Sequence, residues 1–187
     1  MIETVRELIA IDVLDAIFDV SFTRFLAEER ENILKGVSEQ NLCMRLALCI
    51  EREREARGIA GYFVETEYNR NGGALKTIID HNAQIVTIRC DIIMHSRGHI
   101  PAQDNLLVIE MKRSNHPPSE KEKDRTRLRA MTKESYDDVW SADGVTLPEH
   151  VCGYGRGYYL ELDTPHTSFL IERYAKGELE AAHQIEF

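Results

Sequence analysis

Residues Asn105–Lys112 read NLLVIEMK, and residues Cys90–His95 read CDIIMH. Both runs are apolar enough for buried strands, yet each carries charge where a buried strand should have none. Because residues i and i+2 of a strand point to the same face, Glu110 and Lys112 are expected to project side by side. Burying a carboxylate and an ammonium is costly unless something pairs or coordinates them. The two runs are therefore interpreted as neighbouring strands that carry a functional site.

An acidic residue beside a Glu-x-Lys strand predicts an oxygen-rich site for a hard divalent cation. Asp91 lies on the first run, and Glu110 and Lys112 lie on the second. Carboxylates are ligands that Mg²⁺ takes in proteins, and a lysine beside them suits phosphodiester chemistry. Two simpler interpretations exist: a Glu-x-Lys pair can be an exposed edge pair, and an Asp before a strand is usually a turn residue. The apolar run at residues 106–109 favours a central strand.

The size and composition indicate one soluble globular domain. The chain has 187 residues, of which 43% are hydrophobic and 29% charged, and this is ordinary for a soluble protein with a sizeable core. No apolar run approaches the roughly 20 residues that span a bilayer. The N-terminal stretch MIETVRELIAIDVLDAIFDV is acidic and amphipathic, unlike a signal peptide. We therefore expect a cytoplasmic protein.

The cysteines show no C-x-x-C spacing. Two fall on a predicted helix and two lie in or beside predicted strands. We expect them to be reduced, mostly buried thiols, and we expect no structural zinc site. The four residues are Cys43, Cys49, Cys90 and Cys152.

The net charge of −9 counts against a nucleic-acid binder, because phosphate contacts usually require a basic surplus. A bound metal ion can supply positive charge locally, so an acidic nuclease is still possible in principle. Basic residues are in excess between Lys112 and Lys133, directly after the suspected site. The alternative interpretation of that run is a solvated helix face with mixed charges.

Apolar spacing and turn signals predict the secondary structure. Gly36 is predicted to end the first helix, and Ser38 to cap the second. The predicted helices cover residues 2–35, with a break near residues 20–21, then 39–57 and 120–133. The predicted strands cover residues 62–68, 78–79, 85–88, 91–95, 105–112, 152–162 and 167–175. Residues 134–150 are predicted to be irregular, and the last residues to form a short polar tail.

This order predicts a mixed α/β fold with a central sheet flanked by helices. Residues 36–187 are expected to form the core, with residues 1–35 as an N-terminal helical extension packed on it, in a single globular domain overall.

Asp91 followed by Glu110-x-Lys112, each after a hydrophobic run, resembles the PD-(D/E)xK nuclease superfamily, and in particular its small stand-alone bacterial members. Five pieces carry the resemblance in order: SEQNL at 38–42, EYNRNG at 67–72, DIIMHSRG at 91–98, NLLVIEMK at 105–112 and DRTRLRAMT at 124–132. It covers roughly residues 36–175 and implies a restriction-endonuclease-like fold. Cys90 stands where the family name has Pro, a position that mainly shapes the turn.

The resemblance implies a role for each residue of the site. Asp91 and Glu110 would hold Mg²⁺ or Mn²⁺, with the backbone carbonyl of Met111 and water completing the coordination. Lys112 would position or help to deprotonate the attacking water and stabilise charge in the transition state. Glu39 matches the additional helix-borne acid of many members. Glu39 at a helix start also has a simpler interpretation, since an acid there interacts favourably with the helix dipole.

The resemblance also implies a metal-dependent nuclease that hydrolyses DNA, in preference to RNA. Arg127 lies near the position that contacts the scissile phosphate, and Arg125 and Arg129 compete for that role; Arg113 adds to the basic excess. The small size favours action as a homodimer or with a partner protein, through the N-terminal helices. The alternative is a catalytically inactive nuclease-like module that binds nucleic acid or a protein. Glu67 is interpreted as an outward-facing strand residue, with a place near the metal as its alternative.

Overall fold

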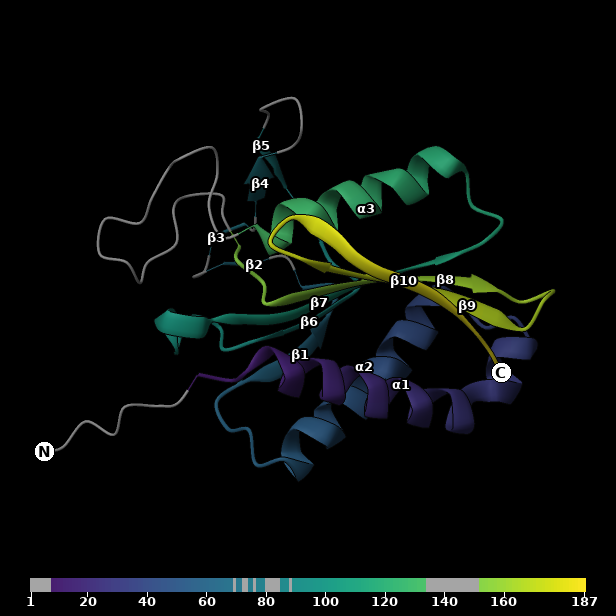
Figure 1. Ribbon diagram of the computed structural model, residues 1–187, viewed down its shortest axis with the longest axis horizontal. Coiled ribbons are helices and arrows are strands. Elements are labelled where there is room, and N and C mark those ends of the chain that lie inside the picture. Colours follow the sequence, from purple (N-terminus) through teal and green to yellow (C-terminus); the bar gives the residue numbers. More distant parts are fainter. Residues whose placement is uncertain are drawn as a thin grey trace, which may run out of the picture.

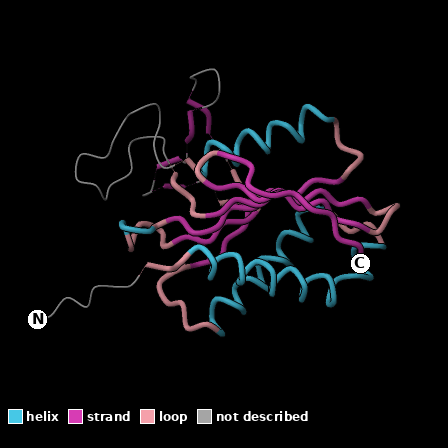
Figure 2. The backbone as a smooth tube through the Cα atoms, in the orientation of Figure 1, coloured by secondary structure: helices cyan, strands magenta, loops and turns pink. Residues whose placement is uncertain are grey.

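The computed structural model describes residues 8–68, 70–71, 74–75, 77–79, 85–87, 89–133 and 152–187. These residues form a mixed α/β fold with three layers, in which α1 and α2 cover one face of a six-stranded sheet and α3 covers the other (Figures 1 and 2). The helices are α1 (Ile11–Leu34), α2 (Glu39–Ala56) and α3 (Pro118–Thr132), and a short 3-10 helix covers Pro101–Gln103.

The strands of the main sheet are β1 (Phe63–Thr66), β6 (Ile92–His95), β7 (Asn105–Arg113), β8 (Arg156–Asp163), β9 (Ser168–Ala175) and β10 (Glu178–Glu186). Two small two-stranded sheets pair β2 (Arg70–Asn71) with β3 (Ala74–Leu75), and β4 (Thr77–Ile79) with β5 (Ile85–Thr87).

The main sheet has the strand order β1-β6-β7-β8-β9-β10. β7 and β8 are parallel, and every other neighbouring pair is antiparallel. Parallel neighbours need a long crossover connection, and α3 lies on the one between β7 and β8. The crossover places α3 over the strand that carries Glu110 and Lys112.

Local signals set the ends of the first two helices as predicted. Gly36 has a φ of +76°, a left-handed conformation that glycine adopts without a side-chain clash. The hydroxyl of Ser38 accepts a hydrogen bond from the backbone N–H of Asn41 at 3.2 Å, which confirms the predicted N-cap. The predicted break near residues 20–21 is wrong, because α1 runs without interruption from Ile11 to Leu34. Ser21 is buried within it, so the small polar residue faces the core and does not end the helix.

Two apolar clusters lie on opposite faces of the sheet. The larger joins α1 and α2 to the sheet and is rich in aromatic rings; the rings of Phe18 and Tyr158 stack with their centroids 3.7 Å apart. The smaller lies beneath α3 and contains Val108 and Ile93 of the sheet with Leu128 and Met131 of the helix. The side chains of α1 thus contribute to the same core as α2.

The predicted polar tail after residue 175 is wrong, because these residues form β10 and pair with β9. Lys176 and Gly177 both have positive φ, 51° and 82°, and make the tight turn of this hairpin. Most of β10 is exposed, which is why its sequence lacks the apolar alternation of a half-buried strand. The predicted irregular segment 134–150 lies outside the described residues.

All four cysteines are free and buried, as predicted. Among the described helices, none combines the length and the apolar character that crossing a bilayer requires.

Candidate active site

The register of the central strands brings Asp91 next to Glu110. β6 and β7 are antiparallel with Ile92 opposite Ile109, so Asp91, one residue before β6, comes opposite Glu110. The backbone N–H of Met111 donates a hydrogen bond to Asp91 Oδ2 at 2.8 Å, which holds this carboxylate against β7. Asp91 and Glu110, which are 19 positions apart in sequence, thus lie side by side where β6 begins.

Glu110 is buried with only one of its oxygens paired. Its side chain is 1% exposed, and Oε1 accepts a hydrogen bond from Arg127 Nη1 at 2.7 Å. Oε2 is also buried, and within the described part of the chain it has no hydrogen-bond partner. Burial, together with the nearby carboxylates of Asp91 and Asp124, raises the pKa of Glu110 well above its ordinary value, against the opposing effect of Arg127. A further positive charge near Oε2 would therefore stabilise the ionised form of Glu110.

Asp91 lies in a similar environment. Burial raises its pKa above the ordinary value, and the carboxylates of Asp124 and Glu67 add to the rise, while the Met111 N–H and Lys112 oppose it. Glu67 directly follows β1, donates its backbone N–H to the Asp91 carbonyl at 3.3 Å, and pairs with Arg89 at 2.6 Å. Its charge therefore acts on Asp91, although its side chain is already paired.

Lys112 lies between the sheet and α3. Its Nζ is 3.1 Å from Asp124 Oδ2 and 3.4 Å from the Met111 carbonyl oxygen. Burial acts to lower the pKa of Lys112, but the carboxylates of Asp124, Asp91 and Glu39 outweigh it and raise the pKa above its ordinary value. Lys112 is thus a cation at neutral pH and suits charge stabilisation better than proton abstraction.

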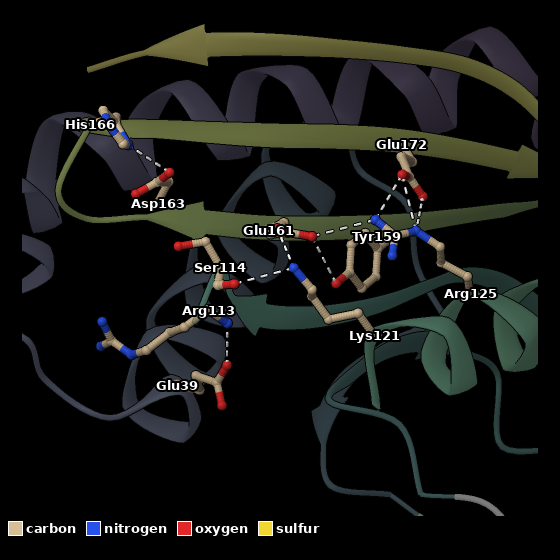
Figure 3. A network of polar contacts seen from close by, with 10 residues as sticks. All are labelled: Glu39, Arg113, Ser114, Lys121, Arg125, Tyr159, Glu161, Asp163, His166 and Glu172. Carbon is tan, nitrogen blue, oxygen red and sulfur yellow. Dashed lines mark hydrogen bonds and ion pairs between the residues drawn. The ribbon is translucent and has the colours of Figure 1, made fainter. Parts of the chain in front are cut away.

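Glu39, at the start of α2, is held at the end of β7. Its Oε2 accepts a hydrogen bond from the backbone N–H of Arg113 at 2.7 Å (Figure 3). Its Oε1 lies 3.6 Å from His116 Nε2. The structure thus brings Glu39 to the strand that carries Glu110 and Lys112, with one oxygen engaged by the backbone.

All four arginines predicted to contact nucleic acid have partners within the protein. Arg125 forms a two-pronged ion pair with Glu172, at 2.8 Å for Nε, and lies over the ring of Tyr159 (Figure 3). Arg113 donates to the Val37 carbonyl and to Thr164. These two arginines stabilise the contacts between elements.

The other two arginines, Arg127 and Arg129, have different partners. Arg129 lies 3.8 Å from the exposed Glu178 and 5.2 Å above the ring of Tyr174, so this ion pair is loose. Arg127 points to Glu110, away from the face that Arg125 and Arg129 share, as the four-residue spacing on a helix predicts. Arg127 is therefore the arginine that the structure brings to the acidic pair.

Asp124 is a site residue that sequence reasoning missed. Its side chain is 5% exposed, and it contacts both Lys112 and Arg127. A signal existed in the sequence: Asp124, Leu128 and Met131 follow helical spacing, so Asp124 occupies a core-facing position where an apolar residue is expected. An acid at such a position needs partners, and here the partners belong to the site.

The comparisons with known proteins assign no family. No protein-family model, curated protein or solved structure matches this chain. Among the described residues, no three His, Cys, Asp or Glu side chains gather into a ready-made metal cluster. The geometry of the acidic pair and its two cations therefore carries the functional argument.

Proposed function

We propose that this protein is a Mg²⁺-dependent nuclease with a restriction-endonuclease-like fold, which hydrolyses phosphodiester bonds in DNA. One observation carries the proposal: Glu110, which is 1% exposed, has a buried Oε2 with no hydrogen-bond partner among the described residues, and it stands opposite Asp91. A buried, half-paired carboxylate beside a second carboxylate is costly for folding alone. A divalent cation between them would satisfy both.

The residues present fit a magnesium or manganese ion. Asp91 and Glu110 would hold it, with the Met111 carbonyl as a further oxygen donor. Mg²⁺ takes few protein carboxylates and keeps several waters, so two acids suffice. The bound ion would lower the pKa of a coordinated water and neutralise phosphate charge. Glu39, at the end of β7, would contact the ion through a bridging water, because the Arg113 N–H already donates a hydrogen bond to one of its oxygens.

The two cations of the site fit the other requirement of phosphodiester hydrolysis. Negative charge grows on the phosphate oxygens as water attacks phosphorus and the bond to the leaving oxygen breaks, and fixed cations stabilise it. Lys112, held as a cation, and Arg127, beside Glu110, are placed for this task. Arg127 is therefore the proposed phosphate contact, in preference to Arg113, Arg125 and Arg129.

The net charge of −9 constrains how DNA would be held. A local site of two cations and one divalent ion contacts few phosphates, so binding should be weak and only mildly dependent on salt. We propose that the protein works as a homodimer or with a partner that supplies further contacts, and that the exposed parts of α1 serve this contact.

Cleavage assays with a matched pair of variants test the function. Single- and double-stranded DNA and RNA are incubated with Mg²⁺ or Mn²⁺ and the wild type, Glu110→Gln or Glu122→Gln. Glu122 is an exposed acid on α3, so its variant controls for the loss of one charge. We expect cleavage by the wild type and Glu122→Gln only. No cleavage of any substrate, together with no divalent-metal binding, would refute the nuclease and favour the inactive binding module.

A further inference from the structure

A single carboxylate on α3 connects the two cations of the site. Asp124 Oδ2 lies 3.1 Å from Lys112 Nζ, and Asp124 Oδ1 lies 3.3 Å from Arg127 Nη1. Arg127 Nη1 also reaches Glu110 Oε1 at 2.7 Å, and Lys112 Nζ reaches the Met111 carbonyl at 3.4 Å. A continuous chain of contacts thus runs from Glu110 through Asp124 to Met111, with Asp124 in its middle.

Asp124 is buried, so it is not a surface residue whose charge is simply solvated. Its side chain is 5% exposed and shares a helix face with the buried Leu128 and Met131. Arg127 follows it by three residues, a spacing that places the two side chains together on a helix. Lys112 comes from the strand beneath. Asp124 is therefore the point at which the helix and the strand contribute their cations to one place.

Two neighbouring cations repel each other, and an anion between them offsets this repulsion by attracting both. Each oxygen of Asp124 lies at ion-pair distance from one cation, Oδ2 from Lys112 and Oδ1 from Arg127, although the buried Oδ2 accepts no hydrogen bond among the described residues. A carboxylate placed between two cations in this way is suited to holding them beside the acidic pair. Its contribution would then act through Lys112 and Arg127.

We propose that Asp124 is a positioning residue that holds Lys112 and Arg127 together beside the Asp91–Glu110 pair, so that both cations face the same phosphodiester. The catalytic consequence rests on the proposed nuclease function, whereas the positioning of Lys112 stands on the geometry of the metal-free protein.

Amine labelling tests the positioning without any assumption about catalysis. The folded, metal-free protein is acetylated briefly, and mass spectrometry gives the modification of Lys112 on β7 relative to that of the exposed Lys123 on α3. Asp124→Asn, close in shape to the native residue, should raise this ratio several-fold, and Glu122→Gln should leave it unchanged. If Asp124→Asn does not fold, Asp124→Glu, which keeps the charge but displaces it, takes its place with the same expectation. An unchanged ratio in a folded variant overturns the proposal.

A double-mutant cycle tests the catalytic consequence. Asp124→Asn should lower kcat by about 10- to 100-fold, the usual effect of losing a residue that orients a catalytic group. In a Lys112→Met background the same change should cost much less, because the lysine to be held is gone. Losses that multiply in the double variant would overturn a role through Lys112. A wild type that cleaves nothing, with the labelling result intact, would instead refute the nuclease and keep the positioning.

Discussion

The two faces of the central sheet differ in what holds the helices against them. On the α1 and α2 face the contact is apolar and aromatic, with Phe18, Phe22 and Phe25 packed against Tyr158 and Phe169. On the α3 face a smaller apolar cluster is joined by buried and half-buried charges. Apolar burial stabilises without directional demands, whereas buried charges are tolerated only when paired. The α1 and α2 face therefore stabilises the fold, whereas the α3 face carries the charges of the candidate site at some cost in folding free energy.

The largest effect is expected on the aromatic face. Phe25 is fully buried, and Phe25→Ala should lower the free energy of unfolding by about 3–5 kcal/mol through lost burial and a cavity. Urea denaturation measures this. Val20→Ala, at an exposed position of the same helix, should change it by less than about 0.5 kcal/mol. A small loss at Phe25 would mean that the α1 face is not the main source of stability.

Divalent metal should stabilise the α3 face. At 100 times its dissociation constant, Mn²⁺ should raise the free energy of unfolding by about 2.7 kcal/mol. The affinity should be higher at pH 8 than at pH 5.5, because burial raises the pKa of Glu110 and Asp91 and the ion must displace their protons. Thermal melting with and without Mn²⁺ measures both. A gain of the same size in Glu110→Gln would contradict the assigned ligand.

Arg125 separates a structural role from a nucleic-acid contact. Its ion pair with Glu172 is largely shielded, the two side chains being 18% and 10% exposed, so Arg125→Met should cost about 2 kcal/mol of stability. Arg129→Met removes a loose pair with an exposed acid and should cost less than about 0.5 kcal/mol. Urea denaturation compares the two. Equal stabilities of the two variants, with DNA binding lost only in Arg125→Met, would indicate that Arg125 contacts nucleic acid.

Glu110→Gln should stabilise the metal-free protein, a smaller effect and of opposite sign. A carboxylate whose pKa is raised by folding adds stability below its unfolded pKa and loses it as pH rises through the folded pKa. Glutamine does not ionise and keeps an oxygen for Arg127. The variant should therefore exceed the wild type by about 1 kcal/mol at pH 8, and the difference should vanish near pH 4. Urea midpoints at the two pH values decide; a less stable variant at pH 8 would show that Glu110 serves the fold.

Nearby residues explain why much of the fold was predictable. The ends of α1 and α2 depend on Gly36 and Ser38, whose effects act on atoms within four positions along the chain. The strand β7 was recognisable because its apolar run carries Glu110 and Lys112 at a spacing of two. The exposed strand β10 was missed, because an edge strand open to solvent has no apolar alternation to detect.

By itself the sequence determined the helices that flank the sheet, the strand that follows Asp91 and the strand that bears Glu110-x-Lys112, since capping, glycine conformation and hydrophobic periodicity are local properties. Only the tertiary structure decided which basic residue belongs to the site. Arg125 and Arg127 are two positions apart on α3, yet one meets Glu172 and the other Glu110. Asp124 came into the site in the same way. The partner of a helix side chain depends on which strand lies beneath it, and the crossover from β7 to β8 sets that position.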